Sequence, residues 1–534
     1  MDLVPDSLQD PVFLVLLFLF GAVAAFLVVP PVVKLARRIK ATERGGPRRL
    51  GEGETPLLGG LAVALPVVFS LLVFGVAGVW LARHWAPISR SASPWAKAML
   101  EYAAGRGNFS RDFIVLALGG IAVVLLGIFD DVRGAGVRVK LLVQFMVATA
   151  ICLSGYVLQG FYIPLVGIVR LNPDFGVIIS ILWIVGLINS FNLIDGLDGL
   201  ASGVALIASL VLAALGFFAG NILLVFTCLV LAGSLAAFLF FNFPPARIYL
   251  GDTGSMFIGY LLATVTLMGT FKGNAAVIIL GPLLALSFPI FETLVSMIRR
   301  LVRGRPLFTG DRYHTHHRLL AKGLSKRRAV LTLYGVTLVL GLAAYLSYVI
   351  PFNSGWSWLP DFILGVTLLG IAWWAGYLKE PTLRRIFHRR RRNTILAAFS
   401  RYAIRSLSSR QATIRPSEIL ELCRREMRLS FLEAWFEDGW ILVGSSGVPP
   451  REELENRPSA LEELRLKTGG GLRLVVRYRF DHQPYEQEAR DTVDCLAQIF
   501  EQGGTPVLLA KALREGRRTG GRERSSVRRS LTAS

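Results

Sequence analysis

Charged side chains are scarce in this sequence of 534 residues: Asp, Glu, Lys and Arg make up only 18% of it, while 53% is hydrophobic. A soluble domain of average composition is about 25% charged and about 45–50% apolar. The shortage of charge therefore excludes an ordinary water-soluble enzyme. Hydrophobic runs near the roughly 20 residues that a helix needs to cross a bilayer recur between Pro11 and Tyr377. These runs predict an all-α polytopic membrane protein.

Cysteine is also rare, and the four cysteines lie too far apart in the sequence to suggest a zinc or redox motif: Cys152, Cys228, Cys423 and Cys495. Lys and Arg are missing before the first hydrophobic run, which instead follows three acidic residues, Asp2, Asp6 and Asp10. Because a cleavable signal peptide begins with a basic leader, we expect none here.

The formal net charge of +21 has two interpretations, nucleic-acid binding or basic loops beside a membrane. Lys and Arg cluster where hydrophobic runs end, which favours basic cytoplasmic loops and gives no reason to expect a nucleic acid as partner. The runs predict about eleven transmembrane helices, at residues 12–33, 57–80, 112–129, 140–158, 174–191, 198–219, 221–241, 254–271, 275–298, 329–350 and 358–378.

The distribution of Lys and Arg between the loops predicts the orientation of these helices. With eleven spans, the odd-numbered loops hold 21 Lys and Arg residues and the even-numbered loops hold seven. Because cytoplasmic loops carry the excess of positive charge, we expect the odd loops and the C-terminus in the cytoplasm and the N-terminus outside. Clusters of carboxylates, Asn and His fall on the same odd loops, which predicts an active site open to the cytoplasm.

Two adjacent carboxylates, Asp130 and Asp131, end the third hydrophobic run. They are either an interfacial cap or, beside an anionic substrate, a divalent-metal site or a general base. Lys140 starts the next helix, with Gln144 four residues later on the same face. Lys140 is either a basic residue at the membrane boundary or a ligand for a phosphate, since a short loop places it opposite the two carboxylates.

The most informative stretch places four polar side chains within ten residues between two hydrophobic helices: Asn189, Asn192, Asp195 and Asp198. Polar groups at membrane depth are costly and are kept where they line a cavity or pair with one another. Gly196 and Gly199 allow a tight turn and a close approach of the backbone to a ligand. An ordinary polar loop is the weaker interpretation, because the stretch contains no Lys or Arg.

A further acid, Asp252, lies between glycines at the start of a helix, ten residues after Asn242. An Asp in this position could simply cap the helix. Two other acidic stretches on the same side of the membrane favour a metal ligand instead. Mg²⁺ is the expected ion, because it binds a few carboxylates together with substrate phosphates and water.

His314, His316 and His317 are three of the six histidines in the chain. A zinc site is one interpretation, although no cysteine is near and the companion ligands are carboxylates, which suit Mg²⁺. The favoured interpretation is a cationic or hydrogen-bonding clamp on a pyrophosphate.

Together these motifs resemble the polyprenyl-phosphate N-acetylhexosamine-1-phosphate transferase family, whose members start cell-envelope glycans on a lipid carrier. The resemblance covers about residues 12–378. In chain order it rests on Pro-x-x-Gly-Gly at Pro56, the Asp-Asp pair, Asp-Gly-Leu-Asp-Gly-Leu at Asp195, Gly-Asp-x-Gly-Ser at Gly251 and His-x-His-His-Arg at His314. The histidine loop is more similar to WecA/TagO-type enzymes, which use UDP-N-acetylglucosamine, than to MraY-type enzymes, which use UDP-MurNAc-pentapeptide.

The resemblance implies transfer of a sugar-1-phosphate, N-acetylglucosamine-1-phosphate from UDP-N-acetylglucosamine, to undecaprenyl phosphate at the bacterial cytoplasmic membrane, with release of UMP. It implies that Asp252 binds Mg²⁺, or Mn²⁺ in its place, with Asp130 or Asp131. One of that pair would deprotonate the lipid phosphate or act as a covalent nucleophile, and Lys140 would contact this phosphate. A homodimer is a possible assembly.

The same resemblance implies two further groups of site residues. The uridine and phosphate pocket would be lined by Asn189, Asn192, Asp195, Asp198 and Asn242. The pyrophosphate or the sugar would be held by His314, His316 and His317.

Composition changes after Tyr377, which predicts four parts. These are a membrane transferase domain (1–380), a basic juxtamembrane linker (381–411), a small α+β cytoplasmic domain that resembles GAF-type sensor domains (412–511) and a disordered basic tail (512–534). Within the α+β domain, the sequence predicts helices at 414–427 and 486–502, a hairpin at 430–444 and a strand at 472–480. A membrane transporter is the main non-enzymatic alternative. A transporter should place its charges near the bilayer midplane, whereas these cluster on one side. A scaffold with decayed catalytic loops is disfavoured by the intact Asp and His residues.

Overall fold

The computed structural model describes residues 11–43, 55–85, 109–163, 167–269, 281–302, 314–350 and 354–376, with Arg425, Cys495 and four strands between them. The chain divides into two compact units. The first comprises Met1–Ile298 and Gly310–Glu380, and the second comprises Arg299–Thr309 and Pro381–Ser534. The predicted linker and tail lie outside the described residues.

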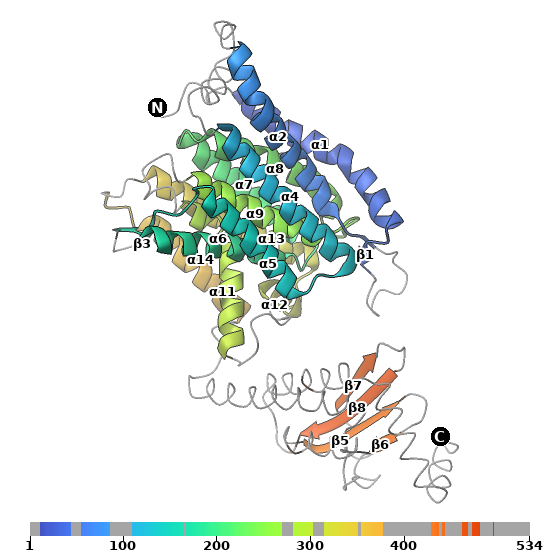
Figure 1. The fold of residues 1–534 in the computed structure, drawn as a ribbon. Helices are drawn as coiled ribbons and strands as arrows, with labels where there is room; N and C mark the ends of the chain where they lie inside the picture. Colours follow the sequence, from blue (N-terminus) through green and yellow to red (C-terminus); the bar gives the residue numbers. More distant parts are fainter. Residues whose placement is uncertain are drawn as a thin grey trace, which may run out of the picture. The chain divides into compact units, whose positions relative to one another are not determined.

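The first unit is a bundle of helices (Figure 1). In chain order these are α1 (Pro11–Arg38), α2 (Gly59–Trp85), α4 (Phe109–Arg133), α5 (Val137–Leu153), α6 (Pro173–Ile194), α7 (Leu200–Phe218), α8 (Ile222–Asn242), α9 (Gly251–Gly269), α11 (Ser287–Val302, with residues 299–302 assigned to the second unit), α12 (Thr315–Ala321), α13 (Lys326–Val349) and α14 (Leu359–Ala375). Two short antiparallel strand pairs accompany them, β1 (Thr42–Glu43) with β2 (Thr55–Pro56), and β3 (Gly160–Ile163) with β4 (Gly167–Arg170).

Seven helices in the described ranges are long and apolar enough to cross a membrane: Pro11–Arg38, Gly59–Val76, Arg111–Arg133, Pro173–Ile194, Leu200–Phe218, Ile222–Asn242 and Lys326–Val349. Helices also occupy the other predicted places, but α5 and α14 have 17 residues each and α11 has 16. The 19-residue helix α9 is not among the seven either. The chain is thus a multi-pass, mostly helical membrane protein, and a total of about eleven spans stays a prediction.

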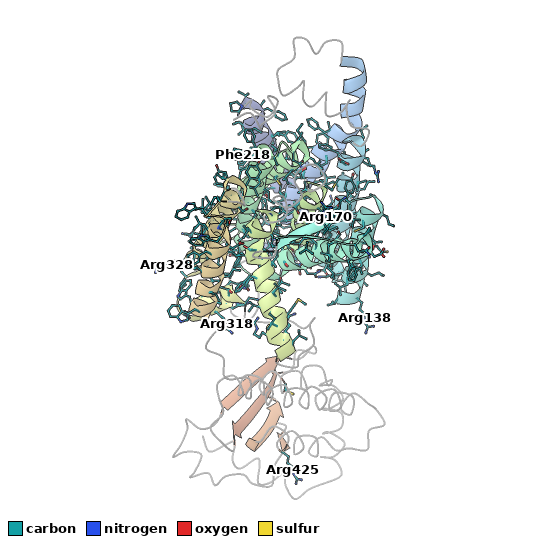
Figure 2. The ribbon with its side chains drawn as sticks, turned by 90° about the vertical axis from the view of Figure 1, so that its left-hand side faces the viewer. Arg138, Arg170, Phe218, Arg318, Arg328 and Arg425 are labelled. Carbon is teal, nitrogen blue, oxygen red and sulfur yellow. The ribbon has the colours of Figure 1, made fainter. Side chains whose placement is uncertain are left out.

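The outer surface of the bundle suits lipid. Large apolar side chains point outward there, including Leu27, Phe69 and Phe240, each at least 60% exposed. Such a surface would be unstable in water but is ordinary against hydrocarbon. In Figure 2, Arg138 and Arg318 lie toward one end of this unit and Phe218 toward the other. Arg138 and Arg318 belong to two of the odd-numbered loops, so these two loops share one side of the bundle.

Helix α9 is the centre of the bundle, because every residue from Thr253 to Gly269 is buried. It packs against α4, α6 and α2. Close packing at its start depends on residues without a β-carbon: a Cβ on Gly60 would lie 2.0 Å from the Gly254 nitrogen, and one on Gly127 would lie 2.3 Å from the Thr253 Cα. Glycine at these positions lets the backbones of α2 and α4 touch the first turn of α9.

The Pro-x-x-Gly-Gly stretch fastens the segment that leads into α9. The Tyr249 N–H donates to the Pro56 carbonyl at 2.9 Å, and the Gly59 N–H donates back to the Tyr249 carbonyl at 3.0 Å. A third bond runs from the Gly60 N–H to the Leu250 carbonyl at 2.8 Å. These bonds fix the backbone immediately before Asp252. The motif therefore supports the site through its backbone.

The second unit contains an antiparallel sheet with strand order β6-β5-β8-β7, formed by β5 (Leu429–Phe436), β6 (Ile441–Val443), β7 (Glu462–Lys467) and β8 (Arg473–Phe480). The predicted hairpin at 430–444 corresponds to the pairing of β5 with β6, and the predicted strand 472–480 corresponds to β8. Apart from Arg425 and Cys495, the two helices predicted around this sheet lie outside the described residues, so the complete α+β domain stays a prediction.

Candidate active site

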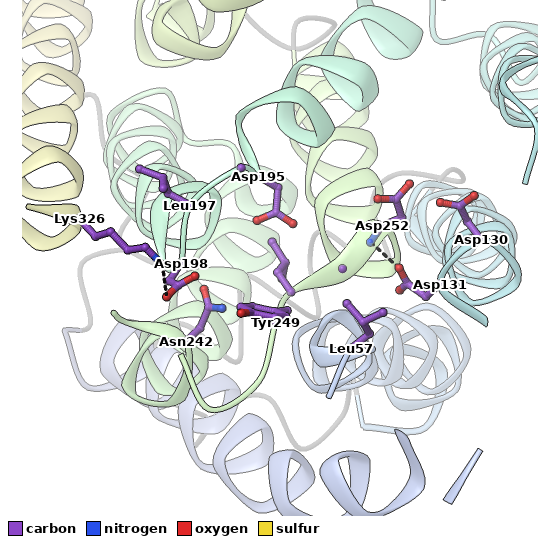
Figure 3. Close-up of a pocket in the computed structure, with 13 residues that line it drawn as sticks. Leu57, Asp130, Asp131, Asp195, Leu197, Asp198, Asn242, Tyr249, Asp252 and Lys326 are labelled. Atoms are coloured by element: carbon purple, nitrogen blue, oxygen red, sulfur yellow. Dashed lines mark hydrogen bonds and ion pairs between the residues drawn. The ribbon is translucent and has the colours of Figure 1, made fainter. Parts of the chain in front are cut away.

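A cavity of about 640 Å³ brings together most of the polar motifs (Figure 3). Parts of α4, α9, the segment after α6 and the segment before α9 form its wall. The wall residues are Leu57, Asp130, Asp131, Asp195, Gly196, Leu197, Asp198, Asn242, Tyr249, Leu250, Gly251, Asp252 and Lys326. The cavity thus joins three acidic stretches that are up to about 120 residues apart in the sequence.

Asp131 caps helix α9 from the neighbouring helix α4. Its carboxylate accepts hydrogen bonds from the Asp252 N–H at 2.8 Å and the Thr253 N–H at 3.1 Å, and from the Thr253 hydroxyl at 2.6 Å. The first N–H groups of a helix have no partner within it, so an external carboxylate satisfies them well. Gly251 has φ +72° and a Cβ there would meet Asp131 at 2.6 Å. Both oxygens of Asp131 are therefore committed to holding this turn.

Lys140 bridges the other two carboxylates of this end of the cavity. Its Nζ lies 2.5 Å from Asp130 Oδ2 and forms an ion pair with Asp252 as well. The second Asp130 oxygen accepts the Ala135 N–H at 2.5 Å. The short loop between α4 and α5 thus places Lys140 opposite the acids, as the sequence predicts. The ammonium group of Lys140 therefore lies where two carboxylates from different helices converge.

Asp130 and Asp252 fit a magnesium ion by the chemistry of their donor atoms. Mg²⁺ in phosphate-transfer sites takes one or two carboxylates and completes its shell with water and substrate phosphates. Among the described residues, no group of three or more His, Cys, Asp or Glu side chains converges as a metal site would require. The protein therefore offers two carboxylates at this point, and substrate oxygens would have to complete the coordination.

Asn189 and Asn192 lie outside the cavity wall and support it from behind. The Asn189 amide donates to Gln144 Oε1 and to the Val185 carbonyl, both at 2.7 Å. The Asn192 amide donates to Ser255 Oγ at 3.1 Å. These bonds connect α6 to α5 and α9. Gln144, four residues after Lys140, thereby positions the helix that carries this lysine.

Asp195, Asp198 and Asn242 do line the cavity (Figure 3). The Asn242 side chain is engaged on both sides, because its Oδ1 accepts the Gly199 N–H at 3.0 Å and its Nδ2 donates to the Ile248 carbonyl at 2.9 Å. Asn242 thus ties the end of α8 to the turn that starts α7. Gly199 has φ +75°, a conformation that favours glycine, which explains the second glycine of the Asp-Gly-Leu-Asp-Gly-Leu motif.

Lys326 is a cavity residue that the sequence analysis missed. It is the first residue of α13 and its Nζ lies 3.8 Å from Asp198 Oδ2. The sequence does not distinguish Lys326 from its neighbours, because it is one of ten Lys and Arg residues between 299 and 328. Tyr249 is a second such residue, and it offers an aromatic ring to the cavity.

The histidine cluster forms helix α12 and its N-cap. His314 and His316 are 7% and 2% exposed, and their rings stack with centroids 5.6 Å apart. His317 is exposed to solvent. Burial, together with the neighbouring His317 and His314, lowers the pKa of His316 to about 3, so its imidazole is neutral at physiological pH. Of the two predicted forms of clamp, His316 therefore suits hydrogen bonding and not a positive charge.

His316 contacts the cavity wall at Gly196, on the side that faces away from the cavity. A Cβ on Gly196 would lie 2.5 Å from His316 Nε2, so only glycine allows the ring to approach this closely. Nε2 is buried and has no hydrogen-bond partner in the part of the chain that the structure describes. The three histidines themselves are not part of the wall. A shift of the turn at Gly196 would be needed to expose Nε2 to a ligand.

Comparison with known proteins places these motifs in a family. Residues 113–270 match glycosyl transferase family 4. The chain is 31% identical over 356 residues to a protein of Bacillus subtilis (strain 168) named as a probable undecaprenyl-phosphate N-acetylglucosaminyl 1-phosphate transferase, covering 67% of this chain and 89% of that protein.

Two further relatives come from other bacteria. The decaprenyl-phosphate N-acetylglucosaminephosphotransferase of Mycobacterium leprae (strain TN) is 31% identical, covering 64% of this chain and 86% of the relative. The undecaprenyl-phosphate alpha-N-acetylglucosaminyl 1-phosphate transferase of Yersinia pestis is 26% identical, covering 67% of this chain and 89% of the relative. The similarity spans nearly the full length of all three proteins, and the chain belongs to glycosyl transferase family 4.

Proposed function

We propose that this protein transfers N-acetylglucosamine-1-phosphate from UDP-N-acetylglucosamine to undecaprenyl phosphate. The single observation that carries the proposal is the cavity whose wall includes Asp130 and Asp252, the two carboxylates that Lys140 bridges, in a chain that is 31% identical to a relative named for this transfer. The products are undecaprenyl-pyrophosphoryl-N-acetylglucosamine and UMP. This reaction would be the first membrane step in the synthesis of a cell-envelope glycan.

The chemical difficulty of the reaction is that one phosphate anion attacks another. An oxygen of the lipid phosphate forms a bond to the phosphorus that carries the sugar, and the bond from this phosphorus to the UMP oxygen breaks. Mg²⁺, when bound, would neutralise charge on the donor pyrophosphate. Asp130 and Asp252 would hold this ion, and Mn²⁺ could take its place. Lys140 would then contact the lipid phosphate, which keeps both anions in reach of a cation.

The geometry supports different roles for the two adjacent acids. Both oxygens of Asp131 accept bonds from the first turn of α9, so Asp131 acts by positioning Asp252. Asp130 has one oxygen on Ala135 and the other on Lys140, and that second oxygen becomes available when Lys140 turns to a phosphate. We infer that Asp130 is the member of the pair that takes a proton from the lipid phosphate or helps to bind the metal.

The remaining wall would receive the nucleotide. Asp195 and Asp198 offer carboxylates to hydrogen-bond donors of the uridine, and Tyr249 offers a ring for stacking. Lys326 offers a positive charge at this end of the cavity. The histidines of α12 would act on the pyrophosphate or sugar from behind the turn at Gly196. The excess of Lys and Arg in the odd loops supports a cytoplasmic active site and an outside N-terminus, in the bacterial cytoplasmic membrane.

The test is release of UMP by the full-length protein in detergent with undecaprenyl phosphate, UDP-N-acetylglucosamine and Mg²⁺. We expect release that needs both lipid and metal and that is lost in Asp252→Ala. Asp174→Ala is the matched control, because Asp174 is also an acid in the first turn of a helix but is exposed. Release only with another UDP-sugar would correct the donor. No release with any UDP-sugar, from folded protein, would contradict the proposed transfer.

A further inference from the structure

Glu292 is a buried carboxylate that none of the sequence motifs includes. It lies on α11, is 2% exposed and accepts hydrogen bonds from the Thr315 N–H at 3.2 Å and from the Thr315 hydroxyl. Its Oε2 also lies 3.8 Å from Nδ1 of His314. A carboxylate is costly to bury unless donors satisfy it, so this arrangement depends on all these partners being in place.

These contacts fix the start of α12. This helix has only seven residues, and its N-cap residue His314 makes no side-chain cap hydrogen bond. A helix this short is unstable by itself, and its first N–H groups need an external acceptor. Glu292 supplies that acceptor from α11. On the other side, Arg318 donates to the Ala375 carbonyl of α14 at 3.1 Å. The histidine helix is therefore held between two neighbouring helices.

A chain of contacts connects Glu292 to the cavity. Glu292 faces His314, the His314 ring stacks on His316 at an interplanar angle of 20°, and His316 abuts Gly196 of the cavity wall. Glu292 does not line the cavity and cannot touch a substrate there. The contacts that lead from Glu292 toward the cavity wall run through His314 and His316.

We propose that Glu292 is a positioning residue for the transferase reaction, which orients His314 and thereby the histidine cluster against the cavity wall at Gly196. This inference rests on the proposed function, since it assigns the histidines to the same donor substrate. A carboxylate with only a packing role would stabilise the protein without affecting how the histidines act on the donor.

The test compares Glu292→Gln with the wild-type full-length protein in the UMP-release assay. Gln keeps the size of the side chain but loses the charge that faces His314. Misplacement of a catalytic group by a fraction of an ångström to 1 Å lowers rates by roughly 10- to 100-fold, so we expect a loss of this size in kcat/KM for the UDP-sugar. The KM for the lipid phosphate should stay unchanged. Asp112→Asn is the matched control, because Asp112 is also a buried carboxylate, which accepts from the Tyr156 hydroxyl.

A double-mutant cycle separates positioning from packing. In a His314→Ala background, Glu292→Gln should cause little further loss, because the residue through which Glu292 acts is already gone. Equal losses in both backgrounds, or a Glu292→Gln protein with wild-type kinetics, would overturn the inference. A melting temperature measured for every variant shows whether a loss of turnover reflects a loss of folded protein.

A second readout does not depend on turnover. Diethylpyrocarbonate modifies accessible imidazoles, and mass spectrometry assigns the modified residue. In the wild-type protein we expect modification at the exposed His317 and protection of His314 and His316. Glu292→Gln should raise the modification rate of the two protected rings several-fold, and an unchanged pattern would refute the positioning role. If the wild-type protein releases no UMP, the proposed function fails, while this mapping still decides whether Glu292 orients the cluster.

Discussion

The carboxylate of Asp131 accepts the backbone N–H of Asp252 at 2.8 Å, and this bond joins two acidic motifs that lie 121 residues apart. One acid therefore holds the other in place. Sequence inspection offers helix capping as an alternative role for each of these acids, and the structure assigns that role to Asp131, which caps α9 from α4. The carboxylate of Asp252 instead forms an ion pair with Lys140, and Asp252 lines the cavity.

Replacing Asp131 by Asn should therefore reduce stability as well as activity. An Asn side chain offers only one oxygen and turns an N–H₂ group toward the N–H groups of α9. A buried N–H that loses its acceptor costs about 1–3 kcal/mol. We expect a lower melting temperature in detergent together with a large loss of UMP release.

Asp252→Asn provides the comparison, because among the described residues the Asp252 carboxylate pairs with Lys140 and caps no helix. This variant should lose turnover with little change in the melting temperature. An Asp131→Asn protein as stable as the wild type would show that the cap contributes nothing measurable. In that case the acid would act in the chemistry directly.

Replacing Lys140 by Gln tests the bridge between the two carboxylates. Without the ammonium group, Asp130 and Asp252 repel each other and a metal ion becomes the cation between them. We expect the Mg²⁺ concentration for half-maximal rate to fall, while the KM for the lipid phosphate rises about tenfold or more because a charged hydrogen bond is lost.

Arg138→Gln is the control for this variant. Arg138 lies two residues earlier on the same helix and is exposed, so its removal changes the surface charge equally. If Lys140→Gln instead needed more Mg²⁺ and kept its affinity for the lipid, Lys140 would support the metal site and not the lipid phosphate.

A methyl group at Gly196 should displace His316. The Cβ of Gly196→Ala would lie 2.5 Å from Nε2 of His316, whose side chain is buried. Forcing such a contact costs typically about 1–3 kcal/mol. UMP release should therefore fall markedly, and Gly186→Ala, where nothing lies within 4 Å of the added carbon, should behave as wild type.

Combining Gly196→Ala with His316→Ala tests the cause of that loss. Removal of the ring relieves the overlap, so the double variant should melt at a higher temperature than the Gly196→Ala protein. A double variant that melts lower than both single variants would show that the methyl group clashes elsewhere.

Much of the fold follows from the sequence because the bilayer restricts it. Runs of apolar residues must form helices, since helices satisfy their backbone groups without water. The runs at 12–33 and 198–219 accordingly coincide with α1 and α7 within a few residues. The ends shift where polar residues continue a helix: α4 extends past Asp130 and Asp131 to Arg133, because these acids are held by neighbours and need not leave the helix.

The sequence predicted the residue types of the site but not the role of each residue. Asp, Asn and His at membrane depth indicate a cavity whatever their contacts. Whether such a side chain faces the cavity or the packing behind it depends on tertiary contacts, which spacing does not contain. Asn189 and Asn242 lie in similar motifs, yet Asn189 is behind the wall and Asn242 is part of it. The sequence does not indicate that Glu292 is buried, because a single acid in an amphipathic helix resembles a surface residue.

The depressed pKa of His316 predicts how stability depends on pH. The unfolded chain binds a proton at His316 with a pKa near 6.5, whereas burial keeps the folded protein from binding it until about pH 3. Below pH 6.5 the unfolded state therefore takes up a proton that the folded state does not. The stability present above pH 6.5 should thus be lost progressively as the pH falls toward 3, by the order of 1–2 kcal/mol at pH 5.

Melting temperatures of wild type and His316→Gln between pH 5 and pH 8 check this, and the variant should show a weaker decline. His317→Gln, which removes an exposed histidine, serves as the control. If the melting temperature declined equally with pH in His316→Gln and wild type, His316 would have an ordinary pKa in the folded protein. A neutral hydrogen-bonding role would then be wrong.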